Sequence, residues 1–205
     1  MIICLVTDRR RTDVLAQARA AVRAGVDLFQ IRERDLSAAA LEALTSSVVA
    51  IARGSSTRVV VNDRLDVAIA AGADGVHLRG DSLPISAVRG IVPAGFLVGR
   101  SVHSADEAAS AVDADYLVAG TMFPSTSKPE ATAWLGVEGL RAIVGVTPVP
   151  VLAIGGVTLD RLSGVAESGA AGVAAIGLLA RSDVSGMTDV TSSLRRLFDT
   201  VRSRP

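Results

Sequence analysis

The sequence is poor in several kinds of residue, and each scarcity excludes a class of protein. Its 205 residues include one cysteine, Cys4, so neither an internal disulfide nor a cysteine-based metal site can form. Aromatic residues make up 3% of the chain, too few to favour base stacking on nucleic acid. The 21 basic and 21 acidic residues cancel, which leaves no overall field to attract nucleic acid or an anionic membrane. Any anion-binding site must therefore be local.

Long apolar runs are also missing. No stretch reaches the length needed to span a membrane, and no basic segment precedes an apolar one with a small-residue cleavage site. We therefore expect a cytoplasmic protein that neither enters a membrane nor binds nucleic acid. A hydrophobic content of 49% suffices for a substantial core, and we predict one domain over residues 1–205. Cys4 lies in an apolar run, where we expect a buried strand residue.

What the sequence does have is a regular alternation of short apolar runs and helix-patterned segments. The runs, each interpreted as a strand, are 2–6, 28–31, 58–61, 75–78, 96–98, 116–119, 149–154 and 172–176. Apolar residues recur at helical spacing between them, and residues 187–201 would form the closing helix. Strand followed by helix, repeated about eight times, predicts an α/β fold, the (β/α)8 or TIM barrel. An open doubly wound sheet is the alternative, because periodicity does not show closure.

Two glycine turns follow the last two predicted strands. Gly155 and Gly156 come after the strand 149–154, and Gly177 comes after the strand that ends at Ile176. Glycine lets the backbone approach an anion closely, and unpaired backbone amides attract the anion without a basic side chain. In a barrel of this type, the loops after strands seven and eight commonly bind phosphate. We therefore predict a site for a phosphorylated small molecule.

The end of the second predicted strand carries two arginines. Alternation along a strand places Gln30, Arg32 and Arg34 on one face. Guanidinium groups bind phosphate oxygens in pairs, so a phosphate or pyrophosphate clamp is one interpretation. The alternative is a solvated strand end, in which Glu33 and Asp35 pair with the two arginines.

Polar residues also follow the third, fourth and fifth predicted strands. Asn62 or Asp63 could cap the next helix, and Asp63 could instead hold a divalent cation through its carboxylate. His77, alone at a strand end, is interpreted as a hydrogen-bonded core residue in preference to a ligand. Ser101 and His103 remain available to face the cavity.

Two segments next to predicted strands have simple local interpretations. Ser104 and Glu107 form a capping box at the start of a helix, which makes both residues structural. After the sixth strand, Ser125, Ser127 and Lys128 belong to a hydroxyl-rich loop that could bind an anion. A solvated polar loop is the alternative there.

Taken together and in order, these segments resemble one protein family. They are IRER at 31–34, NDR at 62–64, GADGVHL at 72–78, GRSVH at 99–103, FPSTSK at 123–128 and AIGG at 153–156. The resemblance, to the thiamine phosphate synthase/TenI family, covers nearly the whole chain. It implies a TIM barrel in thiamine biosynthesis and, from family habit, a homo-oligomer. It also implies that a thiazole phosphate is bound by Gly155, Gly156, Ile176 and Gly177.

The synthase branch of this family joins a pyrimidine pyrophosphate to thiazole phosphate and releases pyrophosphate. For that branch the resemblance implies that Asp63 helps to bind Mg²⁺. It also implies that the two substrates are held by Gln30, Arg32, Asn62, Ser125, Ser127 and Lys128. The chain departs from the pattern at two positions. Ser82 stands where a second metal-binding carboxylate is expected, and Arg34 replaces the usual lysine at the phosphate site.

The TenI branch tautomerises a carboxythiazole phosphate, which needs a proton donor and acceptor but no metal or other cofactor. Its catalytic histidine corresponds here to Thr121, so His103 or His77, with Ser101 as a further candidate, would act in catalysis. Because Ser82 removes a metal ligand, we predict a TenI-like thiazole tautomerase, an isomerase. The alternatives are the magnesium-dependent synthase, a transferase, then a non-catalytic phosphate binder or regulator, and lastly another phosphosugar barrel.

Overall fold

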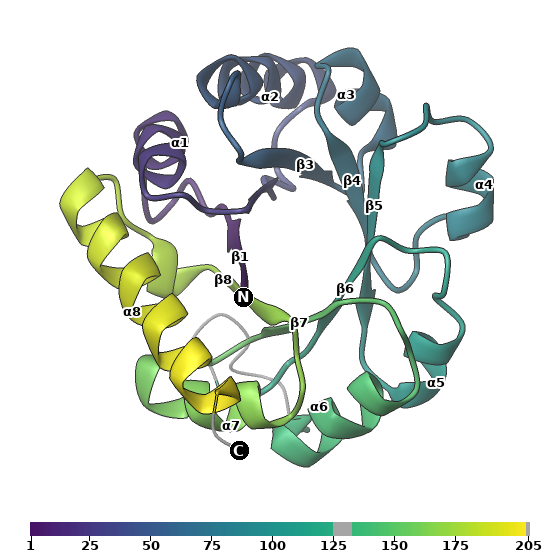
Figure 1. The fold of residues 1–205 in the computed structure, drawn as a ribbon. Helices are drawn as coiled ribbons and strands as arrows, with labels where there is room; N and C mark the ends of the chain where they lie inside the picture. The colour runs from purple at the N-terminus through teal and green to yellow at the C-terminus, as the bar shows by residue number, and fades with distance from the viewer. Residues whose placement is uncertain (125–132, 204–205) are drawn as a thin grey trace.

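The computed structural model describes residues 1–124 and 133–203, and strand and helix alternate along them (Figure 1). The strands are β1 (Ile2–Val6), β2 (Leu28–Ile31), β3 (Arg58–Asn62), β4 (Gly75–Leu78), β5 (Leu97–Val102), β6 (Tyr116–Ala119), β7 (Val151–Ile154) and β8 (Gly172–Ala175). The helices are α1 (Val14–Arg23), α2 (Ala38–Ala52), α3 (Leu65–Ala70), α4 (Ile85–Arg89), α5 (Ala105–Ala109), α6 (Gly136–Gly145), α7 (Leu162–Glu167) and α8 (Val184–Arg202). Two short 3-10 helices are η1 (Leu159–Arg161) and η2 (Gly177–Leu179).

The strands form one closed parallel barrel. Each strand pairs with the next, and β1 pairs with β8. At this closing seam Gly172 lies opposite Ile2, where a Cβ on Gly172 would collide with the Ile2 backbone, so the close approach requires glycine. The predicted TIM barrel is confirmed. The open-sheet alternative is wrong, because the two strands that would be its edges pair with each other.

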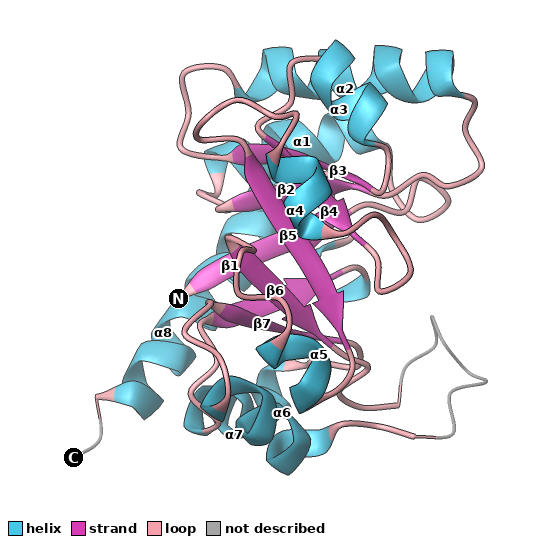
Figure 2. Ribbon diagram, turned by 90° about the vertical axis from the view of Figure 1, so that its right-hand side faces the viewer, coloured by secondary structure: helices cyan, strands magenta, loops and turns pink. Residues whose placement is uncertain are grey.

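Apolar side chains fill two regions of the barrel. The larger lies between the strands and the surrounding helices, which cover the outside of the sheet in Figure 2, and includes Phe29, Ile31 and Leu117. The smaller lies inside the barrel and includes Cys4 and Val118. Cys4 is a buried strand residue as predicted, and burial raises the pKa of its thiol to about 12, which makes the thiol unreactive.

Side-chain caps mark where several helices begin. The carboxylate of Asp13 accepts the backbone N–H of Ala16 at the start of α1, and Asp183 does the same at α8. Ser104 caps α5 by accepting the N–H of Glu107 at 3.2 Å, which confirms the predicted cap. None of the helices in the described part of the chain is long and apolar enough to cross a membrane.

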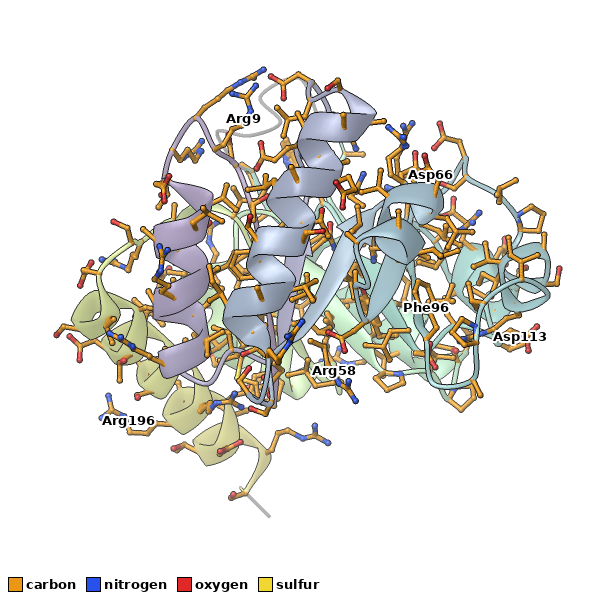
Figure 3. The ribbon with its side chains drawn as sticks, turned by 90° about the horizontal axis from the view of Figure 1, so that it is seen from above. Arg9, Arg58, Asp66, Phe96, Asp113 and Arg196 are labelled. Atoms are coloured by element: carbon orange, nitrogen blue, oxygen red, sulfur yellow. The ribbon has the colours of Figure 1, made fainter. Side chains whose placement is uncertain are left out.

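The amino-terminal rim of the barrel repeats one contact three times. An aspartate just before β2, β4 and β6 accepts the backbone N–H of a residue in the preceding strand. The pairs are Asp27 with Ile3, Asp74 with Val59, and Asp115 with Val98. Each aspartate also pairs with an arginine: in the same order, Arg195, Arg58 and Arg89. Figure 3 shows Arg58 at this end of the barrel and Arg9 and Asp66 toward the other. This rim is therefore built for stability.

Candidate active site

The carboxyl ends of the strands surround a cavity of about 220 Å³. Because the strands are all parallel, the residues that follow them converge on this rim. Predicted site residues that line it from β2 to β4 are Gln30, Arg32, Arg34, Asn62 and His77. Those that line it from β5 onward are Ser101, His103, Thr121, Gly155 and Ile176. The barrel thus gathers residues that lie far apart in the sequence.

Some predicted residues lie elsewhere. Gly156 and Gly177 line a second cavity, which shares Ile154, Gly155 and Ile176 with the first. Ser125, Ser127 and Lys128 lie outside the described residues. The catalytic and binding roles assigned to all these residues stay predictions, because position alone does not test them.

Arg32 and Arg34 line the cavity, and neither is within ion-pair distance of a carboxylate in the described residues. The adjacent acids are engaged elsewhere. Glu33 is buried and accepts the backbone N–H of Arg9 at 3.0 Å, and Asp35 pairs with the Arg9 guanidinium at 2.6 Å. The alternative in which Glu33 and Asp35 pair with Arg32 and Arg34 is therefore wrong. Burial, and next the charge of Arg34, lower the pKa of Arg32, as expected where positive charge is concentrated.

A third arginine, Arg79, lines the same cavity, and the sequence analysis misses it. Its guanidinium lies between two carboxylates: Nη2 is 2.6 Å from Asp81 Oδ2, and Nη1 is 3.6 Å from Asp63 Oδ2. Its backbone N–H donates to the Ser82 hydroxyl at 2.8 Å, and that hydroxyl donates to Asp63. The available signal was its position directly after β4, in the segment that departs from the family pattern.

Asp63 is exposed to the cavity rim and is not a helix cap. Its backbone φ is 64°, in the left-handed region, and the cap position of α3 is Arg64, where no side chain accepts a hydrogen bond. The interpretation of Asn62 or Asp63 as a cap is therefore wrong. Within residues 1–124 and 133–203, no cluster of three or more His, Cys, Asp or Glu side chains could hold a metal ion. Asp63 offers one hard oxygen ligand, which fits a magnesium ion whose coordination is completed by substrate phosphates.

His77 is buried in the barrel wall with both ring nitrogens engaged. Nδ1 lies 3.2 Å from the Tyr116 hydroxyl and Nε2 lies 2.9 Å from Ser101 Oγ, and the ring stacks on that of Tyr116 at 5.5 Å. Gly99 makes room for this stack, because a Cβ there would collide with the Tyr116 ring. Burial, and then the charge of Arg100, lower the pKa of His77 to about 3, so the ring is neutral near pH 7. This geometry fits the interpretation of His77 as a hydrogen-bonded core residue.

His103 lies at the half-exposed edge of the cavity. Glu107 Oε2 accepts its backbone N–H at 2.7 Å and lies 3.2 Å from its ring Nδ1. The carboxylate therefore fixes both the backbone and the ring of His103. The ring remains at the cavity edge, where a ligand could contact it.

The first glycine turn follows β7, and the space around it requires glycine. Gly155 and Gly156 have φ values of 98° and 64°. A Cβ on Gly155 would lie 2.6 Å from Thr121 Cγ2, and one on Gly156 would lie 2.5 Å from the carbonyl oxygen of Pro124. The turn is therefore packed directly against the loop that follows β6.

The second turn, after β8, completes a small cavity of about 130 Å³ whose walls are largely backbone. Gly177 lies on this cavity with no atom closer than 3.8 Å to the position of an added Cβ, and that atom is Nη1 of Arg11. Arg11 belongs to the loop after β1, where its Nε lies 3.2 Å from Asp8. The sequence analysis misses Arg11, because only barrel closure brings this loop beside β8.

Comparisons with known proteins agree with this arrangement. The sequence profile of the family described as thiamine monophosphate synthase matches residues 3–179. The chain is 40% identical to the thiamine-phosphate synthase of Methanoregula boonei over 90% of its own length and 84% of that protein. It is 40% identical to that of Methanoculleus marisnigri, over 94% and 89%. A solved structure, the thiamine phosphate pyrophosphorylase from Pyrococcus furiosus, superposes with a TM-score of 0.84 at 32% identity, covering 98% of this chain and 96% of that one.

These findings correct the predicted activity. The prediction of a TenI-like tautomerase, an isomerase, is wrong, because the relatives just described carry the synthase or pyrophosphorylase name. The prediction gave too much weight to the missing carboxylate at Ser82. In the structure the Ser82 hydroxyl still bonds to Asp63, and the Arg79 guanidinium beside them changes the local charge. By sequence along nearly its whole length and by fold, the chain belongs to the thiamine monophosphate synthase family.

Proposed function

We propose that the protein is a thiamine-phosphate synthase, a transferase that joins hydroxymethylpyrimidine pyrophosphate to thiazole phosphate and releases pyrophosphate. One observation carries the proposal: three arginines and no acid line the described part of the cavity, and a backbone-walled cavity adjoins it. A site with two different anion-binding ends suits two phosphorylated substrates. The names of the relatives support the same activity.

The three arginines suit the leaving group of this reaction. The bond between the pyrimidine's methylene carbon and the pyrophosphate oxygen breaks, and its electron pair leaves with the pyrophosphate. Negative charge therefore grows on the leaving oxygen. Arg32, Arg34 and Arg79 present guanidinium groups on that side of the cavity, where fixed positive charge stabilises the departing anion.

Between its charged groups the cavity has surfaces that suit two heterocycles. Val118, Ile154 and Ile176 supply apolar contacts, and Gln30 and Asn62 supply amide groups that can donate and accept hydrogen bonds. Both amide side chains belong to largely buried residues, so their positions are well defined. A mostly apolar wall with a few polar groups is typical of sites for small ring compounds.

The glycine turns suit the phosphate of the second substrate. The cavity bounded by Gly155, Gly156, Ile176 and Gly177 is walled mainly by backbone, whose amides can donate to phosphate oxygens. Arg11 lies next to Gly177 and adds a positive charge at its edge. This cavity adjoins the main one, so a thiazole phosphate held there would place its ring toward the pyrimidine.

Magnesium is the cofactor that this activity involves. Asp63 is the residue of this chain that would hold it, with the Ser82 hydroxyl bonded to the same carboxylate. When bound, the ion would neutralise part of the pyrophosphate charge. A single protein carboxylate is enough when the substrate brings most of the oxygen ligands. The predicted homo-oligomer and the predicted cytoplasmic location stay predictions.

The test is a product analysis with a matched control. The purified protein is incubated with both substrates, with and without Mg²⁺, and the products are separated by chromatography; we expect thiamine phosphate and pyrophosphate in equal amounts. Arg32→Gln removes a charged hydrogen-bond donor and should lower kcat/KM about 10- to 100-fold. Arg58→Gln makes the same charge change at the opposite rim and should leave kcat/KM unchanged. Binding of thiazole phosphate without turnover would contradict the proposal and favour the non-catalytic binder.

A further inference from the structure

The cavity concentrates positive charge in a chain whose total charge is zero. Arg32, Arg34 and Arg79 all line it, and none of its described lining residues is a carboxylate. The charges are close enough to affect one another, since burial, then Arg34 and, more weakly, Arg79 lower the pKa of Arg32. Such an arrangement is costly unless a polyanion neutralises it. The cavity is therefore organised for a ligand with more than one negative charge.

Arg79 is the least firmly held of the described contacts of Asp63. The distance from Nη1 to Asp63 Oδ2, 3.6 Å, is an ion-pair separation but too long for a hydrogen bond. Its shorter contact, 2.6 Å to Asp81, involves a carboxylate with 71% of its side chain exposed. Exposed pairs of this kind contribute little to stability, so the guanidinium can exchange partners at small cost.

Arg79 and Asp63 also belong to a second hollow that adjoins the main cavity. It measures about 170 Å³, and Arg34, Asn62 and Arg79 line both spaces. A metal ion that approached Asp63 from this side would meet the Arg79 charge. A guanidinium and a divalent cation repel each other strongly at such distances, so only one of them can be close to the carboxylate at a time.

We propose that Arg79 is a third pyrophosphate-binding arginine of this site and that it competes with divalent cations for the carboxylate of Asp63. This inference rests on the proposed function for the identity of the ligand. In the free protein Arg79 partly neutralises Asp63 and keeps metal affinity low. When pyrophosphate is present, the guanidinium pairs with its oxygens and leaves the carboxylate to the metal that the pyrophosphate carries.

The first test measures binding of inorganic pyrophosphate to the intact protein by calorimetry, without metal. Arg79→Gln should weaken binding about tenfold or more, as for the loss of a charge-assisted hydrogen bond. Arg58→Gln is the control, because Arg58 also pairs with an exposed aspartate, Asp74, but at the opposite rim. Equal affinities of the two variants would overturn the assignment of Arg79 to the anion site. Thermal unfolding of both variants shows that each is folded.

The second test measures Mn²⁺ binding to the free protein by electron paramagnetic resonance, with no substrate present. Arg79→Gln should raise Mn²⁺ affinity severalfold, because it removes the competing charge. The gain should vanish in the double variant Arg79→Gln with Asp63→Asn, and asparagine tolerates the positive φ at position 63. Unchanged or reduced Mn²⁺ affinity in Arg79→Gln would overturn the competition.

Neither titration requires turnover, so the two proposals can fail separately. If no thiamine phosphate forms while Arg79→Gln shows both expected changes, the proposed function is wrong and the role of Arg79 as an anion ligand and metal competitor stands. If thiamine phosphate forms and Arg79→Gln behaves like Arg58→Gln in both titrations, the inference on Arg79 is wrong and the synthase stands.

Discussion

Replacing Gly177 by aspartate tests the phosphate cradle with little disturbance of the fold. The backbone at Gly177 has no positive φ, and the nearest atom to an added Cβ is 3.8 Å away, so a side chain fits. At Gly155 and Gly156 the same change would force side chains against Thr121 and Pro124 and would test folding instead. Gly177 is thus the position of the cradle where charge can be changed alone.

The expected loss of affinity follows from Coulomb repulsion. A carboxylate about 4 Å from a phosphate repels it by about 4 kcal/mol at an effective dielectric constant near 20. Arg11, whose Nη1 lies next to this position, would pair with the new carboxylate and offset part of that repulsion. We expect a loss between about 2 and 4 kcal/mol, or about 30- to 1,000-fold in Kd for thiazole phosphate.

The assay is isothermal titration of thiazole phosphate into the wild type, Gly177→Asp and Gly177→Asn. Asparagine has the shape of aspartate without the charge, so this control separates repulsion from steric exclusion. Gly177→Asp should bind far more weakly than Gly177→Asn, and both should unfold near the wild-type temperature. Equal affinities of the Asp and Asn variants would refute the argument, because the anion would then not be bound at Gly177.

The remaining predictions concern stability, pH and the metal. Asp115→Ala leaves the buried N–H of Val98 without its acceptor and should lower the free energy of unfolding in urea by about 1–3 kcal/mol; Asp115→Asn keeps an oxygen acceptor and should cost less, and equal losses would contradict this account. His77 has a pKa lowered to about 3, against 6.5 in the unfolded chain, so between those values only the unfolded state binds the proton and stability falls as the pH drops; His77→Gln should reduce the slope of unfolding free energy against pH in that range, and an unchanged slope would exclude the histidine as its source. Ser82→Asp places a second carboxylate beside Asp63 and should raise Mn²⁺ affinity about tenfold or more; no change would mean that position 82 does not face the metal.

The sequence was sufficient to predict the barrel because its strands are uniformly buried and its helices are regularly spaced. Short apolar runs identify strands whose two faces are both covered, and the boundaries differ by only a few residues: the run predicted at 96–98 is β5 (Leu97–Val102). Closure was not visible in the pattern. It depends on the contact of Gly172 with Ile2, between strands at opposite ends of the sequence.

The site was predictable where a residue type and a strand end coincide, and not where contacts cross the barrel. Arg32 and His77 follow directly from their positions after strands. Arg11 was missed because its loop meets Gly177 only in the closed barrel. Arg79 was missed because its segment was read as a loss of a metal ligand, although the same segment gains a guanidinium beside Asp63. The wrong choice of isomerase has this origin, since a single absent carboxylate was weighed without its neighbours.

The two anion-binding ends differ in a way that fits the proposed reaction. The phosphate of the thiazole stays attached throughout, and the cavity around Gly156 and Gly177 would hold it with backbone that is fixed by packing. The pyrophosphate must be bound, stabilised as it departs and then released. Arg32 and Arg79 are long side chains without firm partners in the described residues, so they can follow the leaving group and let it go. Rigid backbone on one side and movable guanidinium groups on the other therefore match a group that remains and a group that leaves.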